Sequence, residues 1–503
     1  MNIKGTLEKG ESRFAQKPAI IFKDRQITFT ELHQLSVRLA SGLNRLGIKK
    51  GDKIGIVLPN CPEYVYSYLA TFILGAIGVP LDFMLKNDEI ISCLSHSEAK
   101  ILIALPKKDL DFDLIKQSVP SLKNIVILGP DIPGCDSFHK LLHDGAQQLP
   151  NVAISPNDPA LIMYTSGTTG KPKGILLNYK HLDGSPRAME HFVDLKESDI
   201  KLCAIPLSHI GGFIYIQNCI IYGITLVLME RFSPFEFLEL IDKHKVSCFH
   251  IVPPMYNAIL TLKQIEKFDL SSLRWVVVFG APSAPEILER FHKYCPNAKL
   301  LNGWGMTETC PPNTVTPLSS SNIASVGKPS PLCEIKIVSD DGGFLSAGVI
   351  GEIVIKSEYL MAEYYKDPEL TKETIRDGWL YTGDLGRYDQ DGFLYIVGRK
   401  KEMIKVGGQI VFAPEVEAAF YKSADIAEVA VIGMADAMKG EAVKAFVVLK
   451  EGSVLKPEDL RYFVKDHLAN FKVPSQVEIR KELPKNRTGK IDKELLRQEV
   501  AAR

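Results

Sequence analysis

The sequence predicts an α/β protein with a large N-terminal domain of doubly wound sheets and a small β-barrel, followed by a small α+β domain. Three observations support this prediction. Apolar runs of strand length alternate with helical patterns over much of the chain, short β-like runs fill about 325–397, and a charged run follows a strand at 398–402. The chain, with 503 residues, is also too long for a single core.

The first half of the chain predicts a parallel sheet. Residues 19–22 and 53–58 are expected to be strands, and the helix between them is expected to begin after an N-cap at Thr30. Further on, 246–252 and 274–279 are apolar without a polar alternation. Such runs are typical of central strands that are covered on both faces.

Later segments predict two smaller units. Short β runs at 334–338, 351–355 and 392–397 favour a small β-barrel or sandwich. The charged run 398–402 is a candidate boundary, although a hairpin exit would look the same. The residues from there to 503 suffice for a compact α+β module.

Composition favours small-molecule chemistry in a reducing compartment. Hydrophobic residues make up 46% of the chain and charged residues 24%, and 60 basic residues balance 60 acidic ones. This balance does not favour a nucleic acid as partner. Nine scattered cysteines, with no Cys-x-x-Cys pair, argue against disulfides or a zinc site. We therefore expect a cytoplasmic protein.

Two long apolar stretches, 65–81 and 202–229, resemble membrane spans in length. Glycine and proline interrupt both, so we expect a buried helix passing into a strand in the first, and strand, loop, helix and strand in the second. Charge appears as early as Glu8, so no signal peptide is expected.

The most informative stretch is 165–174, Thr-Ser-Gly-Thr-Thr-Gly-Lys-Pro-Lys-Gly, which follows the apolar run 160–164. Its glycines allow close backbone approach, its hydroxyls are neutral donors and its lysines are cations, as a phosphate loop requires. Pro172 after Lys171 excludes a Walker A loop, which needs a hydroxyl there. A solvated turn is the alternative for a loop of this composition.

This order of ten residues resembles the phosphate loop of the adenylate-forming enzymes, the superfamily of acyl-CoA synthetases, peptide-synthetase adenylation domains and luciferases. Further motifs of this superfamily follow in the correct order over essentially the whole chain. The ATP-binding residues that the resemblance implies are Thr165, Ser166, Gly167, Thr168, Thr169, Gly170, Lys173, Gly280, Ala281, Pro282, Asn302, Gly303, Trp304, Gly305, Met306, Thr307, Asp384, Arg399 and Lys490.

The resemblance also implies roles for the residues around the nucleotide. Trp304 stands where the family usually has tyrosine and offers a stacking face for the purine. Thr307 would bond the α-phosphate, and Glu308 would hold Mg²⁺ against the triphosphate. Asp384 would accept both ribose hydroxyls, and Arg399 would reach the same ribose or a phosphate. Taken singly, each is more often a packing or surface residue.

Lys490 is the expected catalytic cation, with Thr307 and His209 as further catalytic candidates. It ends the run 486–490, Asn-Arg-Thr-Gly-Lys, ahead of a predicted helix, and this run resembles the last motif of the family. When a carboxylate attacks the α-phosphorus, negative charge gathers on the phosphoryl oxygens, and a flexible ammonium can stabilise it.

The C-terminal module is expected to move in the second half-reaction. The resemblance implies domains at 1–398 and 402–503, with a hinge at 399–401 centred on Lys401, where many relatives have aspartate. The residues expected to bind coenzyme A are Lys405, Gly407, Gly408 and Gln409. The Pro-Ala order that is common in the family is inverted here at 413–414, which leaves the detailed thiol contacts open.

The acyl pocket is expected beside the run 206–213, Pro-Leu-Ser-His-Ile-Gly-Gly-Phe. A lone histidine in such a run is more often a core residue, but the family places an aromatic residue or histidine here. The predicted pocket residues are His209, Gly211, Gly212, Phe213, Phe279, Cys310 and Pro311. The pocket walls carry no charge to neutralise an α-amino group, which argues against an amino-acid adenylation domain.

Together the residues and the resemblance predict an ATP-dependent carboxylic acid:CoA ligase that uses ATP, Mg²⁺ and coenzyme A and forms an acyl-AMP. A medium- or long-chain fatty acid is the expected substrate. Alternatives are a coumarate- or benzoate-like aromatic or alicyclic acid, a carrier protein as acceptor, a luciferase, or a nucleotide-binding homologue without turnover. No transmembrane segment is expected, and a homo-oligomer is possible.

Overall fold

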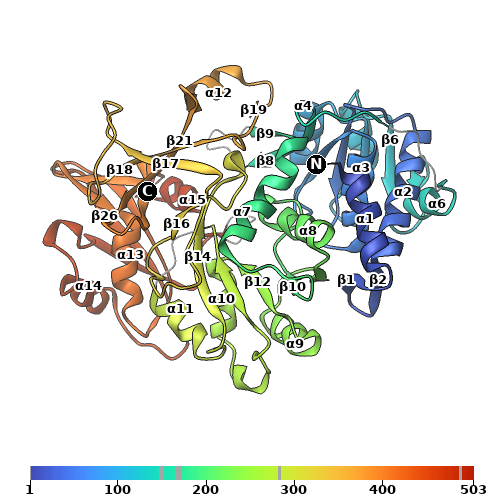
Figure 1. The fold of residues 1–503 in the computed structure, drawn as a ribbon. Helices are drawn as coiled ribbons and strands as arrows, with labels where there is room; N and C mark the ends of the chain where they lie inside the picture. Colours follow the sequence, from blue (N-terminus) through green and yellow to red (C-terminus); the bar gives the residue numbers. More distant parts are fainter. Residues whose placement is uncertain (1, 147–151, 166–172, 281–284, 486–489, 503) are drawn as a thin grey trace.

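The computed structural model describes residues 2–146, 152–165, 173–280, 285–485 and 490–502. Two large sheets with helices on their faces form the N-terminal part (Figure 1). Two five-stranded sheets follow, and the last of them belongs to the C-terminal module. The predicted α/β class, with a large sheet-containing domain and a small C-terminal domain, is confirmed.

The first large sheet has eight strands in the order β19-β9-β8-β4-β3-β5-β6-β7. Strands β3 to β8 pair in parallel, and β9 and β19 add antiparallel pairs at one edge. The strands are β3 (Lys53–Val57), β4 (Ile77–Pro80), β5 (Ile101–Ala104), β6 (Asn124–Ile127), β7 (Asp136–Ser137), β8 (Pro159–Thr165), β9 (Lys173–Asn178) and β19 (Glu363–Tyr364). Its helices are α2 (Phe29–Arg45), α3 (Pro62–Ile73), α4 (Asn87–Ser97), α5 (Phe112–Ser118) and α6 (Phe138–His143).

The second large sheet has nine strands in the order β16-β15-β14-β13-β12-β10-β11-β1-β2, and its central strands are parallel. The strands are β1 (Pro18–Phe22), β2 (Arg25–Thr28), β10 (Ile200–Cys203), β11 (Thr225–Leu228), β12 (Cys248–Ile251), β13 (Trp275–Val278), β14 (Lys299–Trp304), β15 (Thr314–Val315) and β16 (Lys328–Pro329). Its helices are α1 (Ile3–Phe14), α7 (Gly184–Phe192), α8 (Ile210–Tyr222), α9 (Pro234–His244), α10 (Pro253–Leu260) and α11 (Pro285–His292).

The start of α2 differs from the prediction. Thr28, not Thr30, is the N-cap: its side chain accepts a hydrogen bond from the backbone N–H of Glu31. The Glu31 carboxylate in turn accepts from the backbone N–H of Thr28 at 2.8 Å. This reciprocal capping box satisfies two amide groups that have no partner within the helix, which explains the earlier start.

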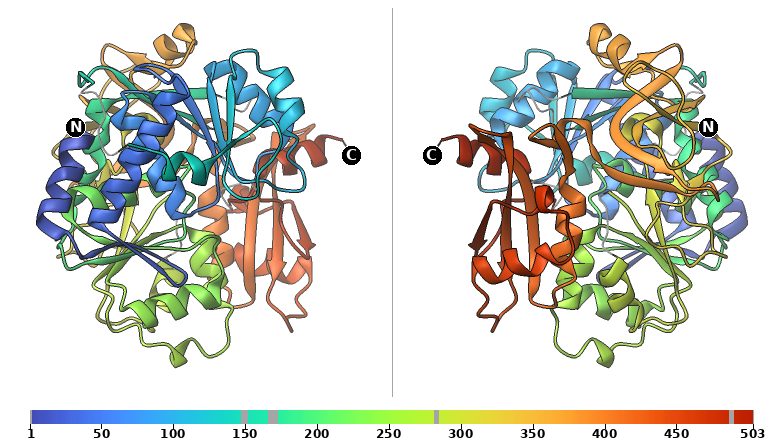
Figure 2. Two further views of the ribbon diagram at one scale, coloured as in Figure 1. Left: turned by 90° about the vertical axis from the view of Figure 1, so that its right-hand side faces the viewer. Right: turned by 90° about the vertical axis from the view of Figure 1, so that its left-hand side faces the viewer.

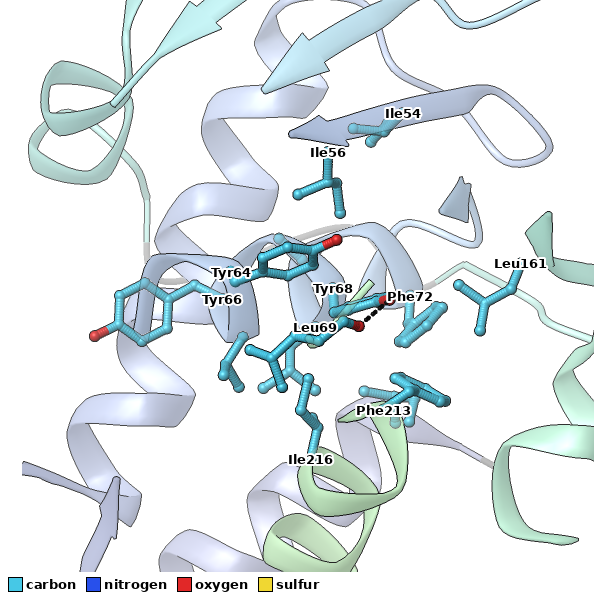
Figure 3. Close-up of a cluster of buried hydrophobic side chains, with 14 of the residues drawn as sticks. Ile54, Ile56, Tyr64, Tyr66, Tyr68, Leu69, Phe72, Leu161, Phe213 and Ile216 are labelled. Atoms are coloured by element: carbon cyan, nitrogen blue, oxygen red, sulfur yellow. Dashed lines mark hydrogen bonds between the residues drawn. The ribbon is translucent and has the colours of Figure 1, made fainter. Parts of the chain in front are cut away.

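The two large sheets meet over a shared apolar core. Phe213 of α8 packs against Tyr68 and Phe72 of α3, with ring centroids 5.0 and 5.9 Å apart (Figure 3). The stretch 65–81 is the buried helix α3 followed by β4, and 202–229 divides into β10, α8 and β11, as predicted. Within the described ranges, no helix is long and apolar enough to cross a membrane.

Asn60 ties the two sheets together beside this core. It follows β3 of the first sheet and is only 5% exposed. Its side-chain oxygen accepts from the backbone N–H of Leu207, and its amide donates to the carbonyl oxygens of Ile205 and Met229. All three partners follow strands of the second sheet, so this one side chain sets the distance between the two sheets where their strands end.

The region predicted to be a β-barrel or sandwich is an antiparallel sheet of five strands. Its strand order is β17-β18-β21-β20, and β22 also pairs with β21. Strands β17 and β20 are the edge strands of this order. Its strands are β17 (Cys333–Val338), β18 (Gly351–Ser357), β20 (Ile375–Arg376), β21 (Trp379–Tyr388) and β22 (Leu394–Arg399), with α12 (Pro368–Thr374) beside it.

The C-terminal module has its own five-stranded sheet, β24-β23-β26-β25 with β27 beside β26. Its elements are β23 (Met403–Val406), β24 (Gln409–Phe412), α13 (Ala413–Tyr421), β25 (Ile426–Asp436), β26 (Gly440–Leu449), α14 (Pro457–Lys465), β27 (Gln476–Arg480) and α15 (Lys493–Ala501). Sheet membership changes between Arg399 and Met403, beside the predicted boundary, although the exact domain limits stay a prediction. In both views of Figure 2 the module lies beside the segment of α10 and α11, and Tyr421 packs there.

Replacing Asn60 with alanine is expected to lower the melting temperature by several degrees. The substitution removes hydrogen bonds to three backbone groups, of which the carbonyl of Met229 and the N–H of Leu207 are in buried hydrogen bonds, a loss of about 3 kcal/mol. Thermal unfolding of the purified variant measures it, with Asn157→Ala in an exposed turn as the matched control. Equal melting temperatures for the Asn60 variant and the wild type would show that this contact does not hold the sheets together.

Candidate active site

Strand ends place the polar residues of the site. Thr165 ends β8 and Lys173 begins β9, and these two residues face each other in the antiparallel register. The parallel strands β12 and β13 of the second sheet end close by, and ligands bind α/β sheets at this carboxyl edge. Several predicted residues lie outside the described residues, namely Ser166, Gly167, Thr168, Thr169, Gly170, Ala281 and Pro282.

A buried carboxylate joins two of the predicted ATP-binding residues. Asp384, 5% exposed, accepts a hydrogen bond on Oδ2 from the indole N–H of Trp304 at 2.9 Å. Its Oδ1 lies 2.9 Å from Nε of Arg399. Asp384 is on β21, Arg399 is opposite it on β22, and Trp304 ends β14 of the large sheet. Each carboxylate oxygen keeps a second lone pair for a ribose hydroxyl.

The predicted metal ligand has a partner that the sequence did not reveal. Glu308 lies in the short 3₁₀-helix η3 (Thr307–Thr309) and is 8% exposed. Its Oε1 accepts from the hydroxyl group of Tyr364 at 3.0 Å. Burial raises the pKa of Glu308, and the hydrogen bond from Tyr364 opposes this rise. Lys173 lies with Nζ 5.9 Å from the centre of the Tyr364 ring, so a cation from the phosphate-loop strand is close to this carboxylate.

Lys490 lies at the same place. A Cβ atom built on Gly280 would be 3.3 Å from Cε and 3.4 Å from Nζ of Lys490. Burial lowers the pKa of Lys490, the positive charge of Arg399 lowers it further, and Asp384 opposes both effects. The structure therefore brings a lysine of the C-terminal module to the end of β13, beside the carboxylate that holds Trp304.

Packing at the end of β14 explains two predicted glycines. A Cβ on Gly303 would lie 2.1 Å from the Phe279 ring, and one on Gly305 would lie 2.5 Å from Cβ of Pro311. Only glycine lets these chain segments approach so closely. Asn302 has a structural role, because its side-chain amide donates to the carbonyl oxygen of Ile323.

His209 lies where the two sheets meet. It is the N-cap residue of α8, and its Nε2 lies 3.3 Å from Oδ2 of Asp82, which follows β4 of the other sheet. The imidazole is 30% exposed, so it is neither a fully buried core residue nor a surface one. A polar residue directly after a buried strand was the sequence signal that would have identified Asp82.

The predicted acyl residues differ in their surroundings. Gly211 has open space, since the one atom of the described chain within 4 Å of a Cβ there is Cγ2 of Ile205 at 3.7 Å. Gly212 does not provide room: a Cβ would lie 2.1 Å from the carbonyl oxygen of Pro206, so its glycine serves the tight turn. Phe213 points into the core between the sheets, and Cys310 is only 4% exposed. The acyl-binding role of these residues stays a prediction.

The predicted coenzyme A residues share one hairpin of the C-terminal module. Lys405, Gly407, Gly408 and Gln409 are exposed in the hairpin between β23 and β24. Gly407 and Gly408 have φ values of +57° and +82°, as a two-residue hairpin turn requires. In the part of the chain that the structure describes, no atom lies within 4 Å of a Cβ placed on either glycine. Lys401, the predicted hinge, is exposed in η4 (Lys400–Glu402).

The fold and the site together define an adenylate-forming enzyme: two wound sheets end beside a lysine that a smaller C-terminal module supplies. The family model described as AMP-binding enzyme matches residues 7–365, and the AMP-binding enzyme C-terminal domain matches 415–490. The chain belongs to this family of AMP-binding enzymes.

Similar proteins of known activity cover nearly the whole chain. A long-chain-fatty-acid–CoA ligase of Bacillus subtilis (strain 168) is 34% identical over 97% of this chain and 93% of its own. The 4-coumarate–CoA ligase 1 of Solanum tuberosum is 35% identical over 98% and 92%. The crystal structure of the anthranilate CoA ligase AuaEII with anthranoyl-AMP superimposes with a TM-score of 0.94 at 29% identity, covering 100% and 98%. The predicted enzyme class, an AMP-forming acid–thiol ligase, is confirmed.

Replacing Tyr364 with phenylalanine is expected to move the acid limb of the pH–rate profile upward by about one unit. Without the hydroxyl group the Glu308 carboxylate loses a charge-assisted hydrogen bond, so its pKa rises and the ionised form is lost at a higher pH as the pH falls. The measurement is the pH dependence of carboxylate-dependent ATP–pyrophosphate exchange. Tyr462→Phe, on the exposed face of α14, is the control, and identical acid limbs would exclude this role for Tyr364.

Proposed function

We propose that the chain is an ATP-dependent carboxylic acid:CoA ligase that forms an acyl-AMP intermediate and then an acyl-CoA. The observation that carries this proposal is the convergence of Trp304, Asp384, Arg399, Gly280 and Lys490 on one place. These residues come from three segments far apart in the sequence, and together they offer a ring, a carboxylate and two cations. That combination suits a base, a ribose and a phosphate.

In the first half-reaction the acid's carboxylate attacks the α-phosphorus of ATP, and pyrophosphate leaves. The ammonium group of Lys490 stabilises the charge on the phosphoryl oxygens, and Arg399 adds to the positive field. Thr307, at the start of η3, is the proposed hydrogen-bond donor to the α-phosphate. His209 is proposed to orient the acid from the side of the first sheet, held by Asp82.

In the second half-reaction the thiol of coenzyme A displaces AMP and gives the thioester. The exposed hairpin of Lys405, Gly407, Gly408 and Gln409 is the proposed contact for the pantetheine arm. In the present arrangement Lys490 is at the site and the hairpin is not, so the module has to rotate, and Lys401 is the proposed pivot. Free coenzyme A, not a carrier protein, is the proposed acceptor, as the names of the similar ligases support.

Glu308 fits a magnesium site of the kind that binds with a nucleotide. Its Oε1 takes the hydrogen bond from Tyr364, which leaves Oε2 for a metal. No group of three or more metal-binding side chains occurs in the part of the chain that the structure describes. A single carboxylate is sufficient where phosphates and waters complete the shell, and Mg²⁺ would neutralise charge on the triphosphate.

Two classes of acid are candidates. A medium- or long-chain fatty acid is supported by the apolar residues around Gly211 and by the Bacillus relative. An aromatic or alicyclic acid is supported by the coumarate and anthranilate ligases. All nine cysteines are free, which supports the predicted reducing, cytoplasmic location. Homo-oligomerisation stays a prediction.

Carboxylate-dependent ATP–pyrophosphate exchange over a broad panel of acids tests the proposed function. Exchange with at least one acid, followed by acyl-CoA formation with free coenzyme A alone, is expected. No exchange with any acid would favour the alternative of a nucleotide-binding homologue without turnover.

Replacing Lys490 with alanine is expected to reduce acyl-AMP formation by two orders of magnitude or more, since one preorganised charge stabiliser is worth roughly 10²- to 10³-fold. Thioester formation from supplied acyl-AMP should stay within a few fold of the wild type. Lys485→Ala, which removes a partly exposed ion pair with Glu428, is the control. If both half-reactions of the Lys490 variant fell equally, the lysine would not act in the first step.

A further inference from the structure

A fully buried lysine lies behind the acyl side of the site. Lys201 of β10 has its Nζ 5.0 Å from the ring centres of both Tyr215 and Trp275. Its hydrogen bond goes to the side-chain oxygen of Asn218 at 3.1 Å. Among the described residues no carboxylate forms an ion pair with it, because the nearby Asp199 is paired with Arg274. A fully buried lysine that contacts two rings and an amide is unusual, and its burial lowers its pKa.

His250 connects this lysine to the open site. It lies on β12, is 1% exposed, and contacts Tyr215 and Trp275 with ring centres 5.1 and 5.9 Å away. The Phe279 ring stands perpendicular to it at 5.5 Å. Both His250 Nε2 and Trp275 Nε1 are buried and have no hydrogen-bond partner among the described residues. The side-chain nitrogen atoms of Lys201, His250 and Trp275 therefore lie in a buried, closely packed layer behind Phe279.

The Phe279 ring is fixed in place at the border of this layer. It is partly exposed, and it precedes Gly280, the residue that Lys490 approaches. On one side the ring rests on Gly303, where a Cβ would lie 2.1 Å from it, and on the other side it meets His250. An acyl group entering beside Gly280 therefore meets an aromatic wall that cannot easily be displaced.

We propose that Phe279, in contact with His250 behind it, is the floor of the acyl pocket and restricts the substrate to a compact acid, a single ring or a short chain. The inference rests on the proposed acid:CoA ligase function. To pass the floor, an alkyl tail would have to displace the packed rings and lie against the buried amine of Lys201. An apolar chain offers that amine and the neighbouring ring nitrogens no hydrogen bond, so longer tails gain nothing there.

The test compares benzoate, hexanoate, decanoate and hexadecanoate in ATP–pyrophosphate exchange with the purified full-length protein. For the wild type, kcat/KM for benzoate or hexanoate should exceed that for hexadecanoate at least about tenfold, within the usual range of size discrimination. An equal or higher value for hexadecanoate overturns the inference and leaves the proposed function intact. Absence of exchange with every acid overturns the proposed function and the inference with it.

Variants of Phe279 then test whether this residue causes the restriction on the size of the acid. Phe279→Ala should raise the ratio of kcat/KM for decanoate to that for hexanoate about tenfold. Phe279→Leu should raise this ratio less, and it serves as the milder variant if the alanine variant does not fold. Lys201→Met alone should leave the decanoate-to-hexanoate ratio unchanged, because the lysine lies behind the ring. Combined with Phe279→Ala, it should raise the ratio above that of the Phe279→Ala variant. An unchanged ratio in the Phe279 variants would overturn the inference.

The control is Phe249→Leu. Phe249 neighbours His250 on β12, but its side chain lies on the other face of the strand, where it packs against Phe237. This variant should lower thermal stability without changing the decanoate-to-hexanoate ratio. A change in the ratio as large as that of the Phe279 variants would show that general loosening of the sheet, not the floor, sets the acid preference, and would overturn the inference.

Discussion

The structure depends on one buried carboxylate with two partners. Asp384 accepts from Trp304 on one oxygen and pairs with Arg399 on the other, so it joins the nine-stranded sheet to the antiparallel sheet that follows it. A buried charge is tolerated only when it is paired and hydrogen-bonded. The same carboxylate attracts Lys490, which approaches from the C-terminal module. One negative charge thus arranges a ring and two cations around the space for a nucleotide.

Strand β13 connects the two halves of the site. Phe279 and Gly280, against which Lys490 lies, follow this strand directly. Under the proposed function the acid lies one residue away from the place where its carboxylate is activated. The lysine itself is buried close to the positive Arg399, an arrangement that the phosphates of a bound nucleotide would relieve. Such a contact suits a module that leaves the site once pyrophosphate has gone.

Sequence alone identified what depends on local order. Apolar runs predicted the parallel strands, because that signal lies in consecutive residues. The hydroxyl-rich loop after 160–164 predicted a nucleotide site for the same reason, and its role stays a prediction. The N-cap at Thr28, the Tyr364 hydroxyl on Glu308 and the core position of Phe213 were not predicted. Each depends on a contact with a distant segment or on the competition between two neighbouring caps. The burial of Lys201 was not predicted either, since lysine side chains are ordinarily exposed in folded proteins.

The central claim is that Asp384 organises a nucleotide site, and its most direct test is the affinity of the protein for AMP. Isothermal titration calorimetry should show binding to the wild type and a loss of at least about tenfold, or about 1.4 kcal/mol, in Asp384→Ala. Asp340→Ala, which removes an exposed carboxylate paired with Lys400, serves as the control and should bind as the wild type does. Equal AMP affinity in Asp384→Ala and the wild type would contradict the account.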